Sequence, residues 1–491
     1  MLYEGTMRLK GLISILIFVS LKVGAQITFE KKYTPSLQQY GREIFETSDH
    51  GFFLQGTIEQ GWRNCYLIKT DSLGDTLWTK LYGTDSIQFY AHDMTRTPDG
   101  GYLLCGDYQE VLTYPSMDSY VQKIDSLGNQ VWFNLFGWPT VLNGNKDHAD
   151  LIRSLNDGSV IVEGSTKDYY VGIGNYIPVG QGFRSYLAKF DTAGMLVQIK
   201  TVSLLLDTLW GQNFQALDIE TIGDRIYWLG VPSAPYFPNG GGTTLVALDS
   251  NLDTIYTITN GLDNYYGLSK TSTSELVLFG QGLLAKMDTS GTIVWVTPNG
   301  SPSFPNEIIQ LSNGSFASVG GEYHISPFYG DFYNIFYPFN QIVYLDKYDN
   351  TGNLMGSSVF NLPSSVFKQL GYGLVNTFDN GFAFVGYNDQ SIWLVKTDST
   401  GNFSTGLNGS SLESDNLKSF PNPVSDKCSI FSSNIISEIT LLNSAGEVLD
   451  RINVNDTTYS LDMLKYPNAL YFVEVTNNTG NKSRLKIVVV H

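Results

Sequence analysis

The sequence is poor in charged residues, and this shortage limits the partners it suits. Only 16% of its 491 residues are charged, and 47 acidic residues against 30 Lys and Arg give a formal net charge of −17. A chain this acidic does not suit a phosphate backbone or an anionic membrane surface, so we expect no nucleic acid as a partner. Cationic partners and neutral partners such as sugars remain compatible with this charge.

Cysteine and histidine are also scarce. Three cysteines are too few for a disulfide framework: Cys65 and Cys105 lie in apolar strand patterns, and Cys428 lies far away. We expect all three to be buried as small hydrophobic residues; a disulfide between Cys65 and Cys105 after export is the alternative. With five histidines and no Cys/His metal spacing, the sequence predicts no metal ion and no cofactor.

Long apolar runs are lacking beyond the first 25 residues. The run at residues 12–20 is too short to span a bilayer, follows Arg8 and Lys10, and precedes small residues at 23–25. We therefore predict that residues 1–25 are a signal peptide, with Met7 as the start; a buried first helix is the alternative. No transmembrane segment is expected in the mature chain.

What the sequence does contain is an internal repeat. YLIKTDSLGDTLWTKLYG at residues 66–83 returns as YVQKIDSLGNQVWFNLFG at residues 120–137. The element K-x-D-x-x-G recurs, with a degenerate copy at residues 247–253, and the complete copies begin at Lys69, Lys123, Lys189, Lys286, Lys347 and Lys396. Each copy follows a turn and a short apolar strand ending in Gly, such as GYLLCG. The two long copies are 54 residues apart, and a repeat of about this length indicates one structural unit stacked several times.

Each unit has the pattern of four short strands, which predicts an all-β fold, a seven-bladed β-propeller. Asp and Gly in K-x-D-x-x-G suit a type I hairpin turn, so the Asp is interpreted as a turn residue, not a metal ligand. The last unit stops after Gly401 without a fourth strand. Residues 27–33 match the fourth-strand pattern, so we expect them to complete the last blade beside residues 391–397. A linear solenoid is the alternative.

The composition changes after the repeats. Residues 26–403 form the predicted propeller, and residues 404–417 are a polar Gly/Ser-rich linker. From residue 418 onward, short alternating strands with hairpin signals predict a small Ig-like β-sandwich. Within it stand SFPNPVSDKCSI, ITLLNSAGEVL, LYFVEV and the final KSRLKIVVVH.

These motifs, in this order, make residues 418–491 similar to the type A C-terminal sorting domain of type IX secretion cargo. The resemblance implies export through the type IX machinery, with the passenger released or held at the outer cell surface and the sorting domain removed. An accessory Ig-like module is the alternative. The propeller also resembles repeat propellers found in such cargo.

Four insertions, beginning at Asp107, Ser165, Val231 and Gly321, fall between the second and third strands of their units. Connections of this kind share one face of a propeller, so we expect their aromatic side chains to form a binding surface. The candidate residues are Tyr169, Tyr170, Tyr236, Phe237, Tyr323, Tyr329, Tyr333 and Tyr337. Packing of the long loops by their own aromatic residues is the alternative.

Acidic residues open several first strands near the same face. We expect Asp93, Asp150, Asp218 and Glu307 to contribute to ligand binding, and Glu43 has a similar position. Purely solvated or capping carboxylates are the alternative. His92 beside Asp93 and His148 near Asp150 are the other suggestive neighbours, although both could be ordinary surface groups.

These observations predict a secreted or cell-surface β-propeller that binds an extracellular glycan or protein. The alternative is a carbohydrate-active hydrolase or lyase that uses carboxylates in the central funnel. The sequence contains no G-x-S-x-G, H-E-x-x-H or phosphate loop, so we expect no catalytic residue and favour binding over catalysis. A passive coat protein is a third class. The identity of the ligand, bound calcium and the oligomeric state do not follow from the sequence.

Overall fold

The structure is a computed structural model. The described residues are 26–33, 39–59, 63–84, 86–110, 117–137, 146–167, 183–201, 213–233, 243–259, 261–262, 265–280, 282–298, 300–301, 303–321, 342–360, 369–388, 390–402, 417–420, 424–443, 447–480 and 482–489. The chain divides into two compact units, residues 1–405 and residues 406–491. Within the described residues every regular element is a β-strand, which confirms the all-β prediction. The predicted signal peptide and most of the linker lie outside them.

The first unit is built from successive groups of four strands. The first group is β2 (Gln39–Glu46), β3 (Phe52–Glu59), β4 (Arg63–Thr70) and β5 (Thr76–Tyr82). The next is β6 (Ile87–Arg96), β7 (Tyr102–Glu110), β8 (Asp118–Ile124) and β9 (Gln130–Phe136). Then come β10 (Lys146–Ser154), β11 (Val160–Lys167), β12 (Phe183–Phe190) and β13 (Leu196–Thr201).

The pattern continues to the end of the unit. The strands are β14 (Asn213–Ile222), β15 (Arg225–Ser233), β16 (Thr244–Leu248), β17 (Thr254–Ile258), β18 (Tyr265–Lys270), β19 (Leu276–Gly280), β20 (Leu283–Met287) and β21 (Ile293–Pro298). They are followed by β22 (Phe304–Gln310), β23 (Phe316–Gly321), β24 (Val343–Tyr348), β25 (Leu354–Phe360), β26 (Gln369–Asn376), β27 (Phe382–Asn388) and β28 (Ser391–Thr397).

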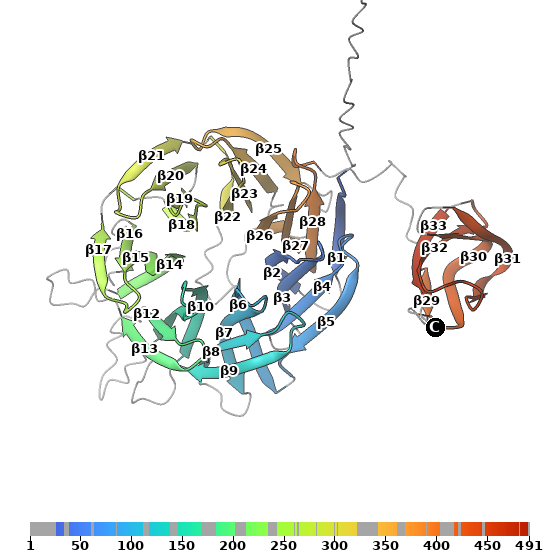
Figure 1. The fold of residues 1–491 in the computed structure, drawn as a ribbon, viewed down its shortest axis with the longest axis horizontal. Helices are drawn as coiled ribbons and strands as arrows, with labels where there is room; N and C mark the ends of the chain where they lie inside the picture. Colours follow the sequence, from blue (N-terminus) through green and yellow to red (C-terminus); the bar gives the residue numbers. More distant parts are fainter. Residues whose placement is uncertain are drawn as a thin grey trace, which may run out of the picture. The chain divides into compact units, whose positions relative to one another are not determined.

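The strands of each group pair in order and antiparallel. The groups β10–β13, β14–β17, β18–β21 and β22–β25 each form a four-stranded sheet. The groups β2–β5 and β6–β9 are joined into one sheet by a single parallel pair, Asn64 with Phe89. Figure 1 shows the sheets arranged around a centre, with β2, β6, β10, β14, β18, β22 and β26 innermost. The arrangement is propeller-like.

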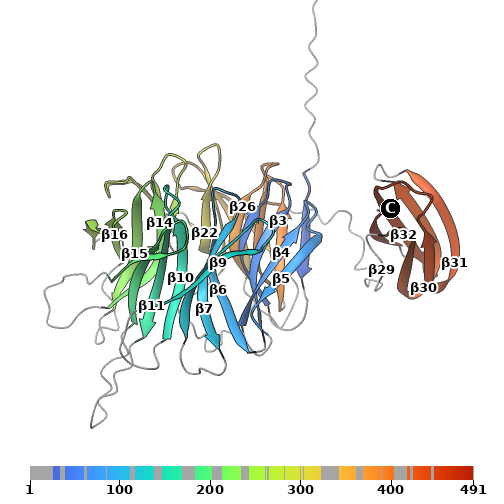
Figure 2. The same ribbon diagram turned by 60° about the horizontal axis from the view of Figure 1, so that its bottom comes forward.

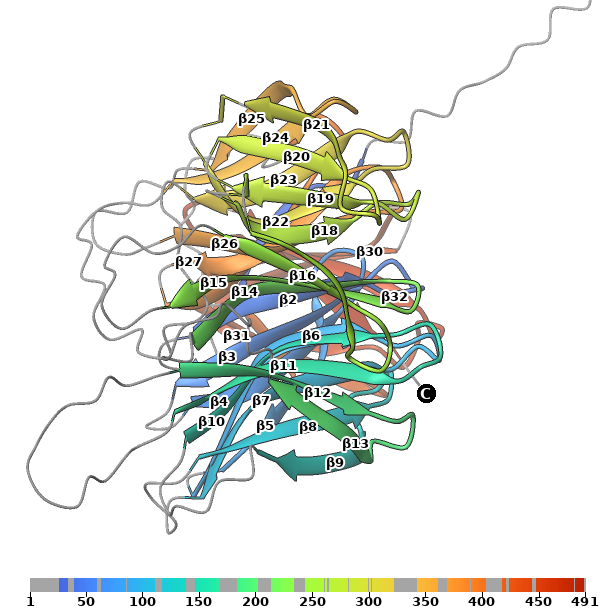
Figure 3. The ribbon, with the colours of Figure 1, turned by 90° about the vertical axis from the view of Figure 1, so that its left-hand side faces the viewer.

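The strands run between the two faces of this ring (Figure 2), and each sheet is layered outward from its inner strand, as β18 to β21 show in Figure 3. The middle strands are buried on both faces: seven of the eight residues of β3 are buried. The outer strands β5 and β25 instead alternate between exposed and partly buried residues. This difference explains the consecutive apolar residues in the middle strands.

Hydrophobic clusters fill the space between neighbouring sheets. Phe53, Leu67 and Leu104 belong to a cluster between β2–β5 and β6–β9, for example. The cluster that completes the circle joins Phe52, Leu54 and Ile68 to Val385 and Leu394 of the last sheet. No sheet of the ring could bury its two faces alone, because these apolar side chains find their partners on the next sheet.

The K-x-D-x-x-G element forms the turn between third and fourth strands. Asp71 Oδ1 accepts hydrogen bonds from the backbone N–H groups of Leu73 and Asp75, both at 2.9 Å. Gly74 has a φ of 77°, which favours glycine. The same Asp contacts recur in the degenerate copy, where Asp249 accepts from Asn251 and Asp253. These contacts confirm the interpretation of the Asp as a turn residue.

An aromatic side chain on the fourth strand covers the turn glycine of the next sheet. Gly128 lies under the ring of Trp78, and Gly194 lies under the ring of Trp132. A Cβ atom built on Gly194 would stand 2.6 Å from the Trp132 ring. At Gly128 and Gly194 the turn therefore needs glycine for space as well as for its backbone conformation.

The N-terminal strand β1 (Phe29–Tyr33) occupies the fourth-strand position of the last sheet, whose order is β1-β28-β27-β26. It pairs antiparallel with β28, with Phe29 opposite Lys396 and Tyr33 opposite Ile392. The strand begins two residues later than the matched segment 27–33, because Ile27 lies before the pairing starts. Figure 1 shows β1 beside β28 at the outer side of the ring.

Side chains of β1 also contact the first group of strands. Lys31 Nζ donates to Asp75 Oδ1 at 2.8 Å, and Tyr33 Oη donates to the carbonyl oxygen of Gly74 at 2.7 Å. The Phe29 ring lies over Gly74. In the next sheet, Lys80 and Tyr82 make the equivalent contacts with Asn129 and Gly128. Thus β1 contacts its neighbour as an ordinary fourth strand does.

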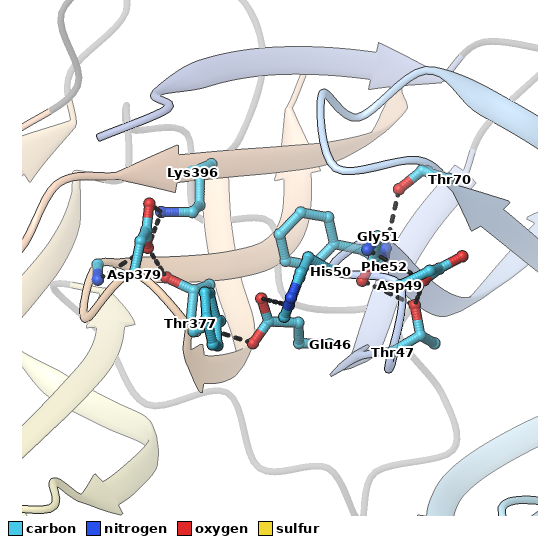
Figure 4. A network of polar contacts seen from close by, with 12 residues as sticks. Glu46, Thr47, Asp49, His50, Gly51, Phe52, Thr70, Thr377, Asp379 and Lys396 are labelled. Carbon is cyan, nitrogen blue, oxygen red and sulfur yellow. Dashed lines mark hydrogen bonds and ion pairs between the residues drawn. The ribbon is translucent and has the colours of Figure 1, made fainter. Parts of the chain in front are cut away.

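A second polar network joins the last sheet to the first at the turn between first and second strands (Figure 4). Lys69 Nζ donates to Asp49 Oδ2 at 2.9 Å, and Lys396 Nζ donates to Asp379 Oδ1 at 2.8 Å. Between them, Glu46 Oε2 accepts from the backbone N–H of Phe378 at 2.9 Å. In the first and last sheets the Lys of K-x-D-x-x-G thus holds the preceding turn of its own sheet.

The second unit is one five-stranded sheet of β29 (Lys418–Phe420), β30 (Lys427–Asn443), β31 (Val448–Asp462), β32 (Leu470–Asn477) and β33 (Lys482–Val488). β30 pairs with β29 and β31 over its first half, and with β31 and β32 over its second half. Register shifts between Phe431 and Glu438 separate the halves. Ile430, Ile439 and Val473 belong to its own core.

The cysteines are buried and free, as predicted. Cys65 and Cys105 lie in the clusters on either side of the β6–β9 group, and Cys428 lies in the core of the second unit. The alternative disulfide between Cys65 and Cys105 is therefore wrong. No helix among the described residues is long and apolar enough to cross a membrane.

Candidate functional site

A one-residue bulge interrupts every inner strand of the ring at the same place. In β2 the register skips from Gly41 to Glu43, and in β6 it skips from Ala91 to Asp93. Equivalent shifts occur in β10, β14, β18, β22 and β26. A bulge re-aims the side chains beside it. The skipped residues are Arg42, His92, Asp150, Leu217, Tyr266, Asn306 and Tyr372.

All of these skipped residues line one central cavity of about 330 Å³. The residues that follow the bulge in β2, β6, β14 and β22 are carboxylates, and they line the cavity too: Glu43, Asp93, Asp218 and Glu307. Arg153, Lys270 and Phe279 contribute to the same wall. The cavity therefore combines several acidic side chains with cationic and aromatic ones.

Three of the carboxylates bind the backbone of the next inner strand. Asp93 Oδ2 accepts from the N–H of Ile152 at 2.8 Å, and Asp218 Oδ2 accepts from the N–H of Leu268 at 2.7 Å. Glu307 Oε2 accepts from the N–H of Leu374 at 2.5 Å. The carboxylates thus tie neighbouring sheets together as well as lining the cavity. Glu43 makes no hydrogen bond within the described part of the chain.

Two arginines, Arg42 and Arg153, line the cavity beside these carboxyl groups. Arg153 Nη1 donates to Asp93 Oδ2 at 2.6 Å, and Arg153 Nη2 lies 3.6 Å from Asp218 Oδ1. Arg42 points towards β6 instead. Its Nη1 donates to the carbonyl oxygen of His92 at 3.0 Å, and its Nη2 donates to Tyr90 Oη at 2.9 Å. Carboxyl groups outnumber arginines among the residues that line the cavity.

Burial changes the acidity of these carboxyl groups. It raises the pKa of Asp218 to about 7, although Arg153 and two backbone N–H groups act in the opposite direction. It raises the pKa of Glu307 to about 8. Burial, with the neighbouring charges of Asp93 and Glu307, also raises the pKa of Glu43 well above its usual value. At neutral pH several of these groups can therefore donate a hydrogen bond.

A cluster of two histidines and two aspartates stands at the edge of the cavity. His92 Nε2 lies 2.9 Å from Asp107 Oδ2, and His148 Nδ1 lies 3.1 Å from the same oxygen. The other ring nitrogen of His92 faces Asp150 Oδ1 at 3.6 Å. Burial acts to raise the pKa of Asp107, but the two neighbouring histidine rings hold it well below its usual value. His92, Asp107 and His148 could hold a metal ion.

The structure brings together Asp93, Asp150, Asp218 and Glu307, the four carboxylates singled out in the sequence. They do not open their strands, because each lies in the middle of one; that expectation was wrong, and the bulge explains why they still face the centre. Tyr169, Tyr170, Tyr236, Phe237, Tyr323, Tyr329, Tyr333 and Tyr337 lie outside the described residues.

Sequence reasoning missed several members of the site. Arg42 and Arg153 have no motif that marks them, and Asp107 was read only as the beginning of an insertion. A signal for the cluster exists: His92 and His148 stand about one repeat apart, so adjacent sheets could present them to each other. The insertions do connect second and third strands, for example β11 to β12.

Comparison with known proteins adds one family and several distant structures. Residues 418–490 match the family described as secretion system C-terminal sorting domain. No curated protein matches the chain. Solved structures with some similarity include virginiamycin B lyase from Staphylococcus aureus, which is 10% identical, covers 75% of this chain and 98% of its own, and has a TM-score of 0.42.

A protein of unknown function from Dyadobacter fermentans is 12% identical over 65% of this chain and 96% of its own, with a TM-score of 0.43. The Dos1 propeller is 11% identical over 72% of this chain and 77% of its own, with a TM-score of 0.42. Likenesses this weak say nothing about activity. The match to the sorting domain is informative, because this domain marks the chain for type IX export to the cell surface or the medium.

Proposed function

We propose that the protein is an exported seven-bladed β-propeller that binds a sugar residue of an extracellular glycan in its central cavity. The proposal includes a signal peptide at residues 1–25, a propeller at 26–403, a linker at 404–417 and an Ig-like sorting domain at 418–491. The supporting observation is the convergence of Glu43, Asp150, Asp218 and Glu307, with aromatic side chains, on one cavity.

The blade count depends on how the joined sheet is divided. The groups β2–β5 and β6–β9 share only the pair of Asn64 with Phe89, and each has its own four-strand antiparallel order. A hydrophobic cluster separates them, as it separates the other neighbouring groups. Counting them as two blades gives seven, with β1 completing the last.

The cavity suits a sugar in size and chemistry. Its volume of about 330 Å³ lies at the small end of typical ligand sites, which favours one or two sugar rings over a protein segment. Carboxylates accept hydrogen bonds from hydroxyl groups, and protonated carboxyls such as Glu307 can donate to them. Tyr266 and Tyr372 also line the cavity, and aromatic rings suit contact with sugar rings. The aromatic loops remain proposed contacts for longer glycans.

A second candidate function is a carbohydrate-active hydrolase or lyase. One observation favours it: Glu307, with a pKa raised to about 8, can hold a proton at neutral pH, while Asp93 is paired with Arg153. A protonated carboxyl near a charge-balanced carboxylate is the arrangement of an acid and a base in glycoside cleavage. A binding experiment must therefore also detect cleavage of the glycan.

The experiment is a glycan array probed with the purified protein, followed by mass spectrometry of the bound glycans. Glu43→Gln and Glu307→Gln are close in shape to the wild type. In Glu307→Gln the new amide oxygen could still accept from the N–H of Leu374, so the fold should be kept. Asp224→Asn, at an exposed turn residue, is the matched control. We expect both cavity variants to weaken retention at least tenfold and the control to leave it unchanged.

The outcomes separate the candidates. Retention without cleavage, lost in the cavity variants, supports the binding protein. Shortened glycans that disappear with Glu307→Gln establish the enzyme instead. A glycan retained equally by all variants, or no retained glycan at all, contradicts a sugar site in the cavity.

A further inference from the structure

We infer that His92, Asp107 and His148 form a binding site for one divalent transition-metal ion. The site stands where β6 and β7 meet β10, so its ligands come from two neighbouring groups of strands. The inference does not depend on what the central cavity binds.

The distances suit an ion of this kind. The three ligand atoms lie within 4.8 Å of one another, and the shortest separations are 2.9 Å and 3.1 Å, from Asp107 Oδ2 to His92 Nε2 and to His148 Nδ1. Around Zn²⁺, with bonds of about 2.0–2.2 Å, tetrahedral ligand atoms stand roughly 3.3 Å apart. Small side-chain movements would therefore admit the ion between the three atoms.

Burial and charge point in the same direction. The side chains of His92 and Asp107 are each only 5% exposed, so the cluster is shielded from competing water. Asp107 and Asp150 place two carboxyl groups beside two imidazole rings. A divalent cation bound here would be held by carboxylate oxygen and by neutral imidazole nitrogen, the forms in which these side chains bind metals.

The second ring nitrogen of His92 supplies an independent observation. Nδ1 faces Asp150 Oδ1 at 3.6 Å while Nε2 points to Asp107. Metal-binding histidines usually donate their other N–H to a carboxylate, which fixes the ring and makes it a better ligand. Asp150 Oδ2 also accepts a hydrogen bond from the hydroxyl group of Ser165 at 3.3 Å, which helps to fix the orientation of this carboxyl group.

The ligand set selects the class of metal. Two imidazole nitrogens and one carboxylate suit Zn²⁺, Co²⁺ or Fe²⁺, whereas Ca²⁺ and Mg²⁺ prefer sites made of oxygen atoms. His92 and Asp150 also line the central cavity, so the ion would stand at its wall. Zn²⁺ is the probe we choose for the test.

The test uses the full chain, purified without a histidine tag, freed of metals with a chelator and titrated calorimetrically with ZnCl₂. We expect one ion per chain, and no heat of binding with CaCl₂ or MgCl₂. His148→Gln and Asp107→Asn should weaken Zn²⁺ binding at least 100-fold, and Asp150→Asn should weaken it about tenfold. His50→Gln, which changes a half-exposed histidine on another turn, is the matched control and should bind as the wild type does.

A spectroscopic measurement on the wild type keeps the inference testable if a variant fails to fold. X-ray absorption of the Zn²⁺-loaded protein should show two imidazole ligands at about 2.0–2.1 Å. A first shell without imidazole, no stoichiometric Zn²⁺ binding, or undiminished binding by a folded His148→Gln protein would each overturn the inference.

Discussion

The one-residue bulge in the inner strands determines which side chains face the centre of the ring. In a regular strand Arg42 and Glu43 would point to opposite faces, as would His92 and Asp93. The bulge lets both members of each pair line the cavity. Sequence alone could place these residues on the inner strands, but it could not show the bulge, because a bulge depends on the register with the neighbouring strand.

Asp218 should make the stability of the ring depend on pH. Its folded pKa of about 7 lies above the ordinary value of 3.8, so the folded protein holds a proton that the unfolded chain releases between these values. The contribution of Asp218 to the free energy of unfolding should therefore fall as pH rises from about 4 to 7, by about 1–3 kcal/mol because the side chain keeps 15% exposure.

Chemical unfolding of the wild type and of Asp218→Asn at a series of pH values measures this effect. The variant has no proton to lose at this position, so its stability should change less over the same range. A variant whose stability changes with pH along the same slope as the wild type would contradict the raised pKa.

Leu252 occupies a turn position where most repeats have glycine. Its φ is 61°, a strained conformation for leucine, but its side chain is fully buried in a cluster with Trp228 and Leu248. Relief of strain is worth about 1–2 kcal/mol, whereas loss of a buried leucine costs about 2–5 kcal/mol. Leu252→Gly should therefore lower the free energy of unfolding by about 1–3 kcal/mol.

The matched control is Ser274→Gly, at an exposed turn residue with a φ of 59°. With no buried side chain to lose, this change should raise stability by about 0.5–1 kcal/mol. Thermal unfolding of both variants tests the comparison, and stabilisation by Leu252→Gly would show that strain outweighs packing.

At the scale of elements, the closing strand was the most predictable unusual feature. Lys31 and Tyr33 stand in the same pattern as Lys80 and Tyr82, and each pair contacts the turn of the following sheet. The match was visible because both strands carry an aromatic residue, a lysine and a tyrosine at alternate positions, so they present the same side chains to the neighbouring turn. The cavity arginines were not predictable, because their roles depend on contacts between different sheets.

Removing residues 26–33 should destabilise the ring strongly. The deletion leaves the edge of β28 unpaired, uncovers Gly74 and removes the contact of Trp393 Nε1 with Glu30. We expect a loss of several kcal/mol and a tendency to aggregate through the open edge, measured by thermal unfolding and light scattering. A truncated protein that is monomeric and as stable as the full chain would contradict this role for β1.

At the scale of the whole molecule, the two units have separate cores. Calorimetry of the purified chain should therefore show two unfolding transitions. A chain ending at residue 405 should keep the transition of the ring within about 2 °C, because no described core cluster combines residues of both units. A single cooperative transition, or a much less stable ring after truncation, would show that the units depend on each other.

The central cavity depends on the closure of the ring, since only a closed ring brings all the inner strands to one cavity. Hydrogen–deuterium exchange of the peptide containing Phe29–Tyr33 tests this closure most directly. Because about half of an edge strand's N–H groups are paired, we predict partial protection equal to that of β5 and β9. Exchange as fast as in an unstructured peptide would contradict the closure, and with it the central site.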